Sequence, residues 1–292
     1  MNENEKYAWR ELSQAWDNVR SDRLRGAAEL LRSALHALRR FLEGVESPDY
    51  SEIESLMNEL ANLRKDMAGF KNCVRFLNDE NPDTLLNSVI QLEEYLDQSS
   101  AMIAQNAVQT FHKPVSVLTI SRSSVVEQVI TALHRSGILE QVIQLESRPA
   151  YEGRKNAERL LDSGIHVTVI PDAAMGYWIY NADTVIVGAD AISTEGNFLG
   201  KIGCYPLALL AREAGCGYYV TAERLKFTHI IPDEYEANKH FPADQLGWET
   251  ASERLALSNI IFETTPGALV TGFITEFGFQ KPPLTILETL SF

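Results

Sequence analysis

Apolar residues in the first third of the chain recur every three or four positions, a spacing that places them on one face of an α-helix. Gly44 and Pro48 are expected to end the first helix, and Asn81-Pro82-Asp83 to open the last. Only three of the 17 glycines lie before residue 111, so we expect residues 1–110 to form a helical domain. The apolar stripes are Leu24, Ala28, Leu31, Leu35, Leu38 and Leu42; Ile53, Leu56, Leu60 and Leu63; and Leu85, Val89, Leu92 and Leu96.

After Pro114 the pattern changes to short aliphatic and β-branched runs separated by segments of helix length. Nearly continuous apolar strands that alternate with helices are typical of a parallel sheet covered on both faces. We therefore expect an α/β protein in which a Rossmann-like domain over residues 111–292 follows the helical domain. Residues 230–249 are polar without a clear period and predict a surface excursion or lid. The apolar runs are 115–120, 141–146, 166–170, 184–189, 217–222 and 259–265.

The charge balance limits which partners the protein can bind. Forty acidic residues against 26 basic ones give a net charge of −14. A chain this acidic repels phosphate backbones and has no broad basic face, so nucleic acid is not an expected partner. An anionic ligand must be held by a local basic pocket.

The cysteines and the hydropathy of the chain further limit the class of protein. Three cysteines without ligand spacing predict neither a disulfide framework nor a metal site, and we expect no cofactor. No apolar run is long enough to span a membrane, and the first residues do not resemble a signal peptide. We therefore expect a cytoplasmic protein that has no membrane partner.

Polar residues follow the predicted strands, where open parallel sheets bind their ligands. Asp190 ends one apolar run, and a buried carboxyl there has its pKa raised toward acid–base use. The basic residues near these strand ends predict a pocket for a phosphorylated small molecule, assisted by the amides of the helix that follows Ser123 and Ser124. Those basic residues are Arg122, Arg148, Arg154, Lys201 and Lys226.

Each of these positions also has a purely structural interpretation. A serine or aspartate after a strand is commonly a helix cap, and the structural interpretation of Asp190 is a cap for the turn that follows it. Cys204 fits a buried structural cysteine better than a reactive thiol. The glycine-rich segment 195–203 could offer amides and Lys201 to an anion at a helix start, but it is not a P-loop, and no GxGxxG follows the first strand.

Residues 146–227 resemble one known protein family. Its marks occur in order: the ESRP...G run, the DAA.GY helix, the strand ending GADAI, the KIG turn and the AE..KF close. The family unites ribose-1,5-bisphosphate isomerase, methylthioribose-1-phosphate isomerase and the alpha, beta and delta subunits of the eukaryotic translation-initiation guanine-nucleotide exchange factor. In the helical part, Arg25-Gly26-Ala27 is similar to its RGA phosphate motif, and residues 63–68 occupy the place of a second phosphate turn.

The resemblance implies a helical domain on a Rossmann-like domain, with a site for a phosphorylated sugar or nucleotide between them. It also implies homodimers or larger homo-oligomers. Asp190 corresponds to the catalytic acid of the isomerases. The residues it assigns to phosphate and sugar contacts are Arg25, Gly26, Ala27, Arg64, Arg148, Lys201 and Lys226.

The chain departs from the isomerases after its first strand. There the isomerases carry a THC-type turn with a catalytic cysteine, whereas this chain has Ile120 and Ser121. One hypothesis is an aldose–ketose isomerase of a phosphorylated pentose, in which Asp190 moves protons and Ser121 with Arg122 lines the reacting edge. The other is a non-catalytic sugar-phosphate or nucleotide sensor, or an assembly subunit like the exchange-factor alpha subunit.

Overall fold

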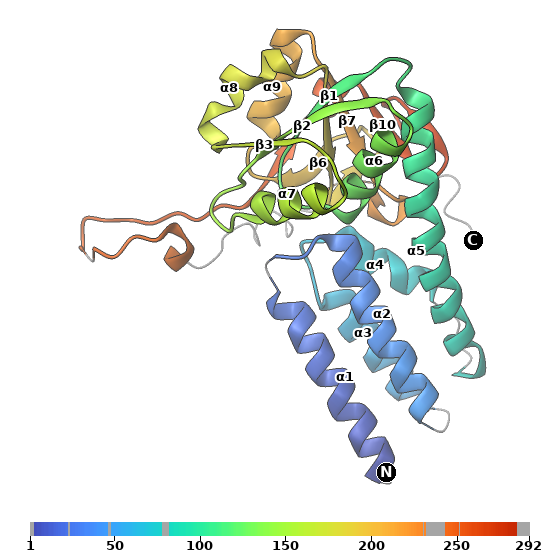
Figure 1. Cartoon of the computed structure of the whole chain (residues 1–292). Helices are drawn as coiled ribbons and strands as arrows, with labels where there is room; N and C mark the ends of the chain where they lie inside the picture. The colour runs from blue at the N-terminus through green and yellow to red at the C-terminus, as the bar shows by residue number, and fades with distance from the viewer. Residues whose placement is uncertain are drawn as a thin grey trace.

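A computed structural model describes residues 3–22, 24–45, 48–77, 82–229, 231, 243–250 and 252–284 (Figure 1). Helices come first and are followed by strands interleaved with further helices, which confirms the predicted fold class. The three predicted apolar stripes lie on α2, α3 and α5, except that Leu63 directly follows α3 and that Leu24 precedes α2 and is exposed. The helices of the first part are α1 (Glu3–Ser21), α2 (Ala27–Gly44), α3 (Tyr50–Asn62), α4 (Ala68–Phe76) and α5 (Pro82–Thr110).

Local sequence explains where these helices begin and what they bury. Asp49 caps α3 by accepting a hydrogen bond from the Glu52 amide, and the Glu52 carboxylate accepts one from the Asp49 amide. This reciprocal pair satisfies two amides that the helix cannot satisfy itself. Leu31, Leu35 and Leu38 of α2 are almost fully buried, so the apolar stripe is the face that packs into the helical core.

A seven-stranded sheet forms the second part, in the order β11-β10-β7-β4-β1-β2-β3. All neighbouring strands are parallel except β10 and β11. Helices α6 (Ser124–Arg135) and α7 (Glu152–Asp162) cover one face, and α8 (Met175–Trp178) and α9 (Cys204–Ala214) cover the other (Figure 1). The first five predicted runs are confirmed as strands of this sheet. Its strands are β1 (Val115–Thr119), β2 (Leu139–Leu145), β3 (Val167–Ile170), β4 (Thr184–Gly188), β7 (Gly217–Thr221), β10 (Gly272–Thr275) and β11 (Gly278–Gln280).

A smaller sheet has the order β8-β5-β6-β9. The expectation that the sixth run joins the parallel sheet is wrong, because that run supplies β9, which pairs antiparallel with β6. The place beside β7 is taken by β10. An apolar run indicates a strand but does not specify its partner, which depends on residues far away in the chain. The four strands are β5 (Ala191–Ser193), β6 (Phe198–Lys201), β8 (Phe227–Thr228) and β9 (Phe262–Thr265).

The two parts of the chain are interlocked. Leu225, from the segment after β7, is fully buried in the helical core. The Asn72 side-chain amide of α4 donates hydrogen bonds to the carbonyls of Leu225 and Phe227 at 2.8 and 2.9 Å. Helix α5 runs along both parts (Figure 1) and packs Leu92 into the helical core and Ala107 against α6 and the sheet. A domain boundary at residue 110 stays a prediction.

Three further expectations concern a lid, a membrane span and a metal site. Most of the polar stretch 230–249 lies outside the described residues, so its lid role stays a prediction. Within the described ranges, no helix has the length and apolar character needed to cross a membrane. The same residues contain no group of three or more His, Cys, Asp and Glu side chains placed to hold a metal ion.

Candidate functional site

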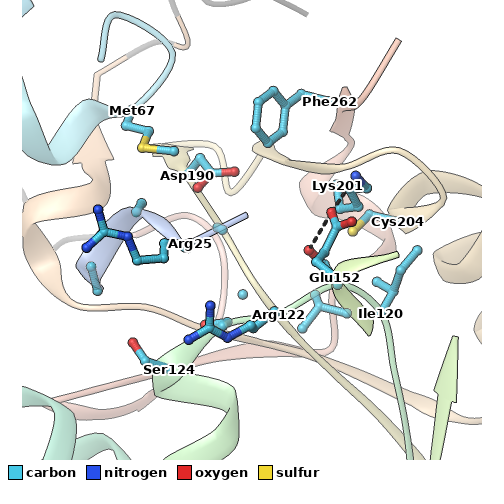
Figure 2. Close-up of a pocket in the computed structure, with 18 of the residues that line it drawn as sticks. Arg25, Met67, Ile120, Arg122, Ser124, Glu152, Asp190, Lys201, Cys204 and Phe262 are labelled. Atoms are coloured by element: carbon cyan, nitrogen blue, oxygen red, sulfur yellow. Dashed lines mark hydrogen bonds and ion pairs between the residues drawn. The ribbon is translucent and has the colours of Figure 1, made fainter. Parts of the chain in front are cut away.

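A pocket lies where the helical part meets the carboxyl-terminal ends of β1 and β4 (Figure 2). Its walls come from the turn before α2, the segment between α3 and α4, the turn between β1 and α6, the residues after β4, and β6. The structure brings together every residue predicted for the site except Arg148 and Arg154. Those that line the pocket are Arg25, Gly26, Ala27, Arg64, Ser121, Arg122, Asp190, Lys201 and Lys226.

Two helices begin at this pocket. Gly26 precedes α2 without a side-chain cap, and Ser123 precedes α6 with its hydroxyl accepting from the Val126 amide. A Cβ atom on Gly26 would lie 3.2 Å from the Arg122 carbonyl oxygen, so glycine permits the close approach of the two turns. Because helix N-termini carry partial positive charge and free amides, their meeting favours an anionic group.

Every predicted cation that lines the pocket forms an ion pair with a carboxylate. Burial makes such pairing necessary, because an isolated charge away from water is costly. An anion bound in this pocket would therefore share these cations with carboxylates. Sequence reasoning missed these carboxylates, and those nearest in the chain, Asp22 and Asp66, are signalled only by their closeness to a predicted arginine. The pairs are Arg25–Asp22, Arg64–Asp66, Arg122–Glu29, Lys201–Glu152 and Lys226–Glu223.

Asp190 follows β4 and is fixed by its own backbone. Its amide donates to the Leu199 carbonyl at 2.9 Å, and its carbonyl accepts from the Ala68 amide at 3.1 Å. Asp190 lines the pocket, and the residue as a whole is half-buried. Burial raises the pKa of Asp190 to about 6, although the nearby Lys226 ammonium lowers it. A carboxyl group with this pKa can both donate and accept a proton near neutral pH.

Ser121 is held beside an acidic residue that the sequence analysis did not identify. Its backbone is left-handed, with φ of 69°, and its amide donates to the Ser147 hydroxyl at 2.7 Å. Its own hydroxyl donates to Oε1 of Glu152 at 3.4 Å. Glu152 opens α7 and also pairs with Lys201, which comes from β6 (Figure 2). Its place inside the ESRP...G run is the sequence signal that could have identified it.

Arg148 and Arg154 do not converge on the pocket as expected. The backbone amides of Ser147 and Arg148 both donate hydrogen bonds to the Asp172 carboxylate, and these bonds fix the conformation of the turn. The Arg148 side chain is exposed and lies over the Tyr151 ring. Arg154 pairs with Glu146 on the exposed side of α7. Asp172 is therefore a structural cap, and a sugar-phosphate contact of Arg148 stays a prediction.

The glycine-rich segment 195–203 differs from the expectation as well. Lys201 lies in β6, and the amides of Gly203 and Tyr205 already donate to the Glu263 carboxylate at 2.6 and 2.9 Å. Those two amides are thus not free for an anion. Burial raises the pKa of the Cys204 thiol well above its ordinary value, which agrees with a structural cysteine.

The fold and the pocket define an α/β protein whose site lies at the carboxyl ends of parallel strands and is closed by a helical part. The chain matches the model of the Initiation factor 2 subunit family over residues 23–282 and belongs to that family. This confirms the resemblance stated from the sequence motifs.

Individual relatives agree with this assignment. The chain is 28% identical over 294 residues to the ribose 1,5-bisphosphate isomerase of Archaeoglobus fulgidus, covering 95% of this chain and 92% of that protein. A crystal structure of the Pyrococcus horikoshii translation initiation factor eIF-2B matches with a TM-score of 0.81 at 28% identity, covering 93% and 97% of the two chains. The 5-methylthioribose 1-phosphate isomerase of P. horikoshii shares the fold, with a TM-score of 0.73 at 22% identity over 96% and 87%.

Proposed function

We propose that the protein is an aldose–ketose isomerase of a phosphorylated pentose, of the ribose-1,5-bisphosphate or methylthioribose-1-phosphate type. The observation that carries the proposal is Asp190, a carboxyl group with a pKa of about 6 in a pocket lined by five cations. A proton-transfer group beside anion-binding groups is what isomerisation of a sugar phosphate requires. The similarity to a ribose 1,5-bisphosphate isomerase over nearly the whole chain supports it.

In this proposal the cations and helix N-termini hold phosphate, and Asp190 moves protons between sugar oxygens. Arg25 and Arg64 come from the helical part, whereas Lys226 comes from the segment after β7. Phosphate groups contacted from both parts hold the sugar against Asp190, and this orientation supplies part of the rate enhancement.

The experiment is turnover by the purified protein. Ribose-1,5-bisphosphate and methylthioribose-1-phosphate are each incubated with the protein, and products are followed by carbon and phosphorus NMR. We expect the corresponding ketose from one of the two. Binding of both compounds without any ketose would contradict an isomerase.

The second candidate is a non-catalytic sugar-phosphate or nucleotide sensor. It is favoured by Ser121, which stands where the family's isomerases carry a cysteine. A sensor would bind ligands in the same pocket and release them unchanged, so the NMR experiment together with calorimetry separates the two candidates.

Ligand binding should depend on the helical part. Arg25 lies at the pocket and is part-exposed, with its guanidinium shared between Asp22 and the Ser33 hydroxyl. Arg25→Ala is expected to weaken ribose-1,5-bisphosphate binding by about 1.5–3 kcal/mol, the range for hydrogen bonds to charged groups. Calorimetry at two salt concentrations measures this loss. Arg40→Ala is the matched control and should bind like the parent, because that side chain also belongs to the helical part but lies outside the pocket and pairs with Glu11. Equal affinity of all three proteins would remove Arg25 from the site.

Self-association is a further part of the proposal. Tyr177 and Tyr180, at α8 and the turn after it, are 77% and 71% exposed. Large aromatic side chains are enriched at protein–protein interfaces. Light scattering should therefore give at least twice the chain mass of 32.7 kDa. A monomer at micromolar concentration would contradict this expectation.

A further inference from the structure

The proposed reaction requires two proton transfers at different atoms of the sugar, and this inference rests on that reaction. When a furanose 1-phosphate becomes a ketose, the bond between C1 and the ring oxygen breaks and the ring oxygen gains a proton. The hydrogen on C2 moves to C1, and the O2 hydroxyl loses its proton as C2 becomes a carbonyl carbon. The site therefore needs a proton donor at the ring oxygen and a proton acceptor at O2, and a single carboxyl group can serve as both only if it reaches both atoms.

Few side chains at the pocket can serve as that acceptor. Among the described residues that line it there is no histidine or tyrosine, and the carboxylates are Asp190 and Glu152. The Cys204 thiol is buried with a raised pKa, so it provides little thiolate. The Ser121 hydroxyl is a hydrogen-bond donor in this arrangement, and an alcohol accepts a proton poorly.

Glu152 has one carboxylate oxygen engaged and one free. Oε1 accepts from Ser121 and pairs with the Lys201 ammonium. Oε2 is buried and has no hydrogen-bond partner in the part of the chain that the structure describes. An unpartnered carboxylate oxygen is costly in the interior unless something pairs with it, and a substrate hydroxyl in the pocket is a group that could do so. Figure 2 shows Glu152 beside Lys201, on a different wall of the pocket from Asp190.

We propose that Glu152 is the general base of the isomerisation and accepts the O2 proton through Oε2. Asp190 supplies the proton to the ring oxygen, so one proton enters the sugar as another leaves. Both carboxyl groups then return to their starting states by exchanging protons with solvent after the product departs. No oxidant, reductant or cofactor is needed.

Ser121 and Lys201 are positioning residues in this scheme. Both contact Oε1, which orients the carboxylate and leaves Oε2 for the substrate. This arrangement accounts for a serine where the family's isomerases have a cysteine, because the proton acceptor is displaced from residue 121 to residue 152.

The test compares Glu152→Gln with the parent and with Glu146→Gln. Glu146 lies six residues earlier, outside the pocket, and pairs with Arg154. Glu152→Gln should lower kcat by about 10²- to 10⁴-fold, the range for a positioned base. It should bind ribose-1,5-bisphosphate as tightly as the parent or more tightly, because it removes a negative charge from the pocket. Glu146→Gln should behave like the parent.

A second pair of variants covers loss of folding and the role of Ser121. If circular dichroism shows that Glu152→Gln is unfolded, Glu152→Asp is used instead. Aspartate keeps the negative charge, but its side chain is one methylene shorter and places the carboxylate farther from O2. This variant should lower kcat at least tenfold. Ser121→Ala should lower kcat by less than about tenfold, because it removes only an orienting hydrogen bond.

The outcomes separate this inference from the proposed function. If the parent turns over neither substrate, the proposed function is wrong, and so is the general-base role of Glu152. If the parent is active and folded Glu152→Gln stays within threefold of it, Glu152 is not the base although the protein is an isomerase. If Ser121→Ala is as damaging as Glu152→Gln, the base is Ser121.

Discussion

Replacing Asp190 with asparagine is expected to lower the turnover of ribose-1,5-bisphosphate by about 10²- to 10⁴-fold, with its affinity nearly unchanged. The amide preserves the shape of the carboxyl group but cannot transfer its proton. Steady-state kinetics by NMR and calorimetry on the same preparation measure the two effects. Parental turnover in this variant would make Asp190 a cap for the turn after β4.

The pH dependence offers an independent check on Asp190. Since burial raises its pKa to about 6, the acid form should be lost as pH rises through 6, and kcat/KM should fall tenfold per pH unit above that value. The free energy of unfolding is expected to decrease with rising pH as well. The folded protein holds this proton more tightly than the unfolded chain, so stability decreases as pH rises from about 4 through 6. Urea unfolding at pH 5 and 7.5 should show that Asp190→Asn loses less stability over this interval than the parent.

Replacing Gly153 with alanine is expected to destabilise the protein by about 3 kcal/mol, the upper range for an overpacked site. A Cβ atom there would lie 1.9 Å from the Leu145 carbonyl oxygen and 2.7 Å from the Ser147 hydroxyl. The nearest obstacle is a backbone atom, so α7 must move away from β2. Glu152 is the preceding residue and would move with the helix. Urea unfolding measures the loss of stability.

Gly176→Ala is the matched control for this substitution. Gly176 lies in α8, and a Cβ atom there would meet only Leu210, at 3.9 Å. The change should leave the free energy of unfolding within about 1 kcal/mol of the parent, because alanine suits a helix where space permits. Equal stability of Gly153→Ala and Gly176→Ala would show that α7 has room to adjust.

Most elements of the fold could be predicted because their signals are local. The stripe through Leu31, Leu35 and Leu38 determines one face of α2 whatever it packs against, and five apolar runs became strands of the main sheet. Five short strands were not predicted, because each spans only two to four residues and none lies in one of the apolar runs; they are β5, β6, β8, β10 and β11. The run at 259–265 indicated a strand but placed it in the wrong sheet, because strand pairing is decided by distant residues.

The sequence by itself determined the helical and α/β parts, the family, and the cations that gather at their junction. Motifs and spacing carry this information because each is a short stretch of chain. Only the tertiary structure decided which charges meet. It turned Arg148 outward, gave every pocket cation a carboxylate partner, and set Glu152 of α7 between Ser121 and Lys201 from two other elements. Electrostatic partners act through space over a few ångströms, so they become visible only when segments distant in the chain are packed together.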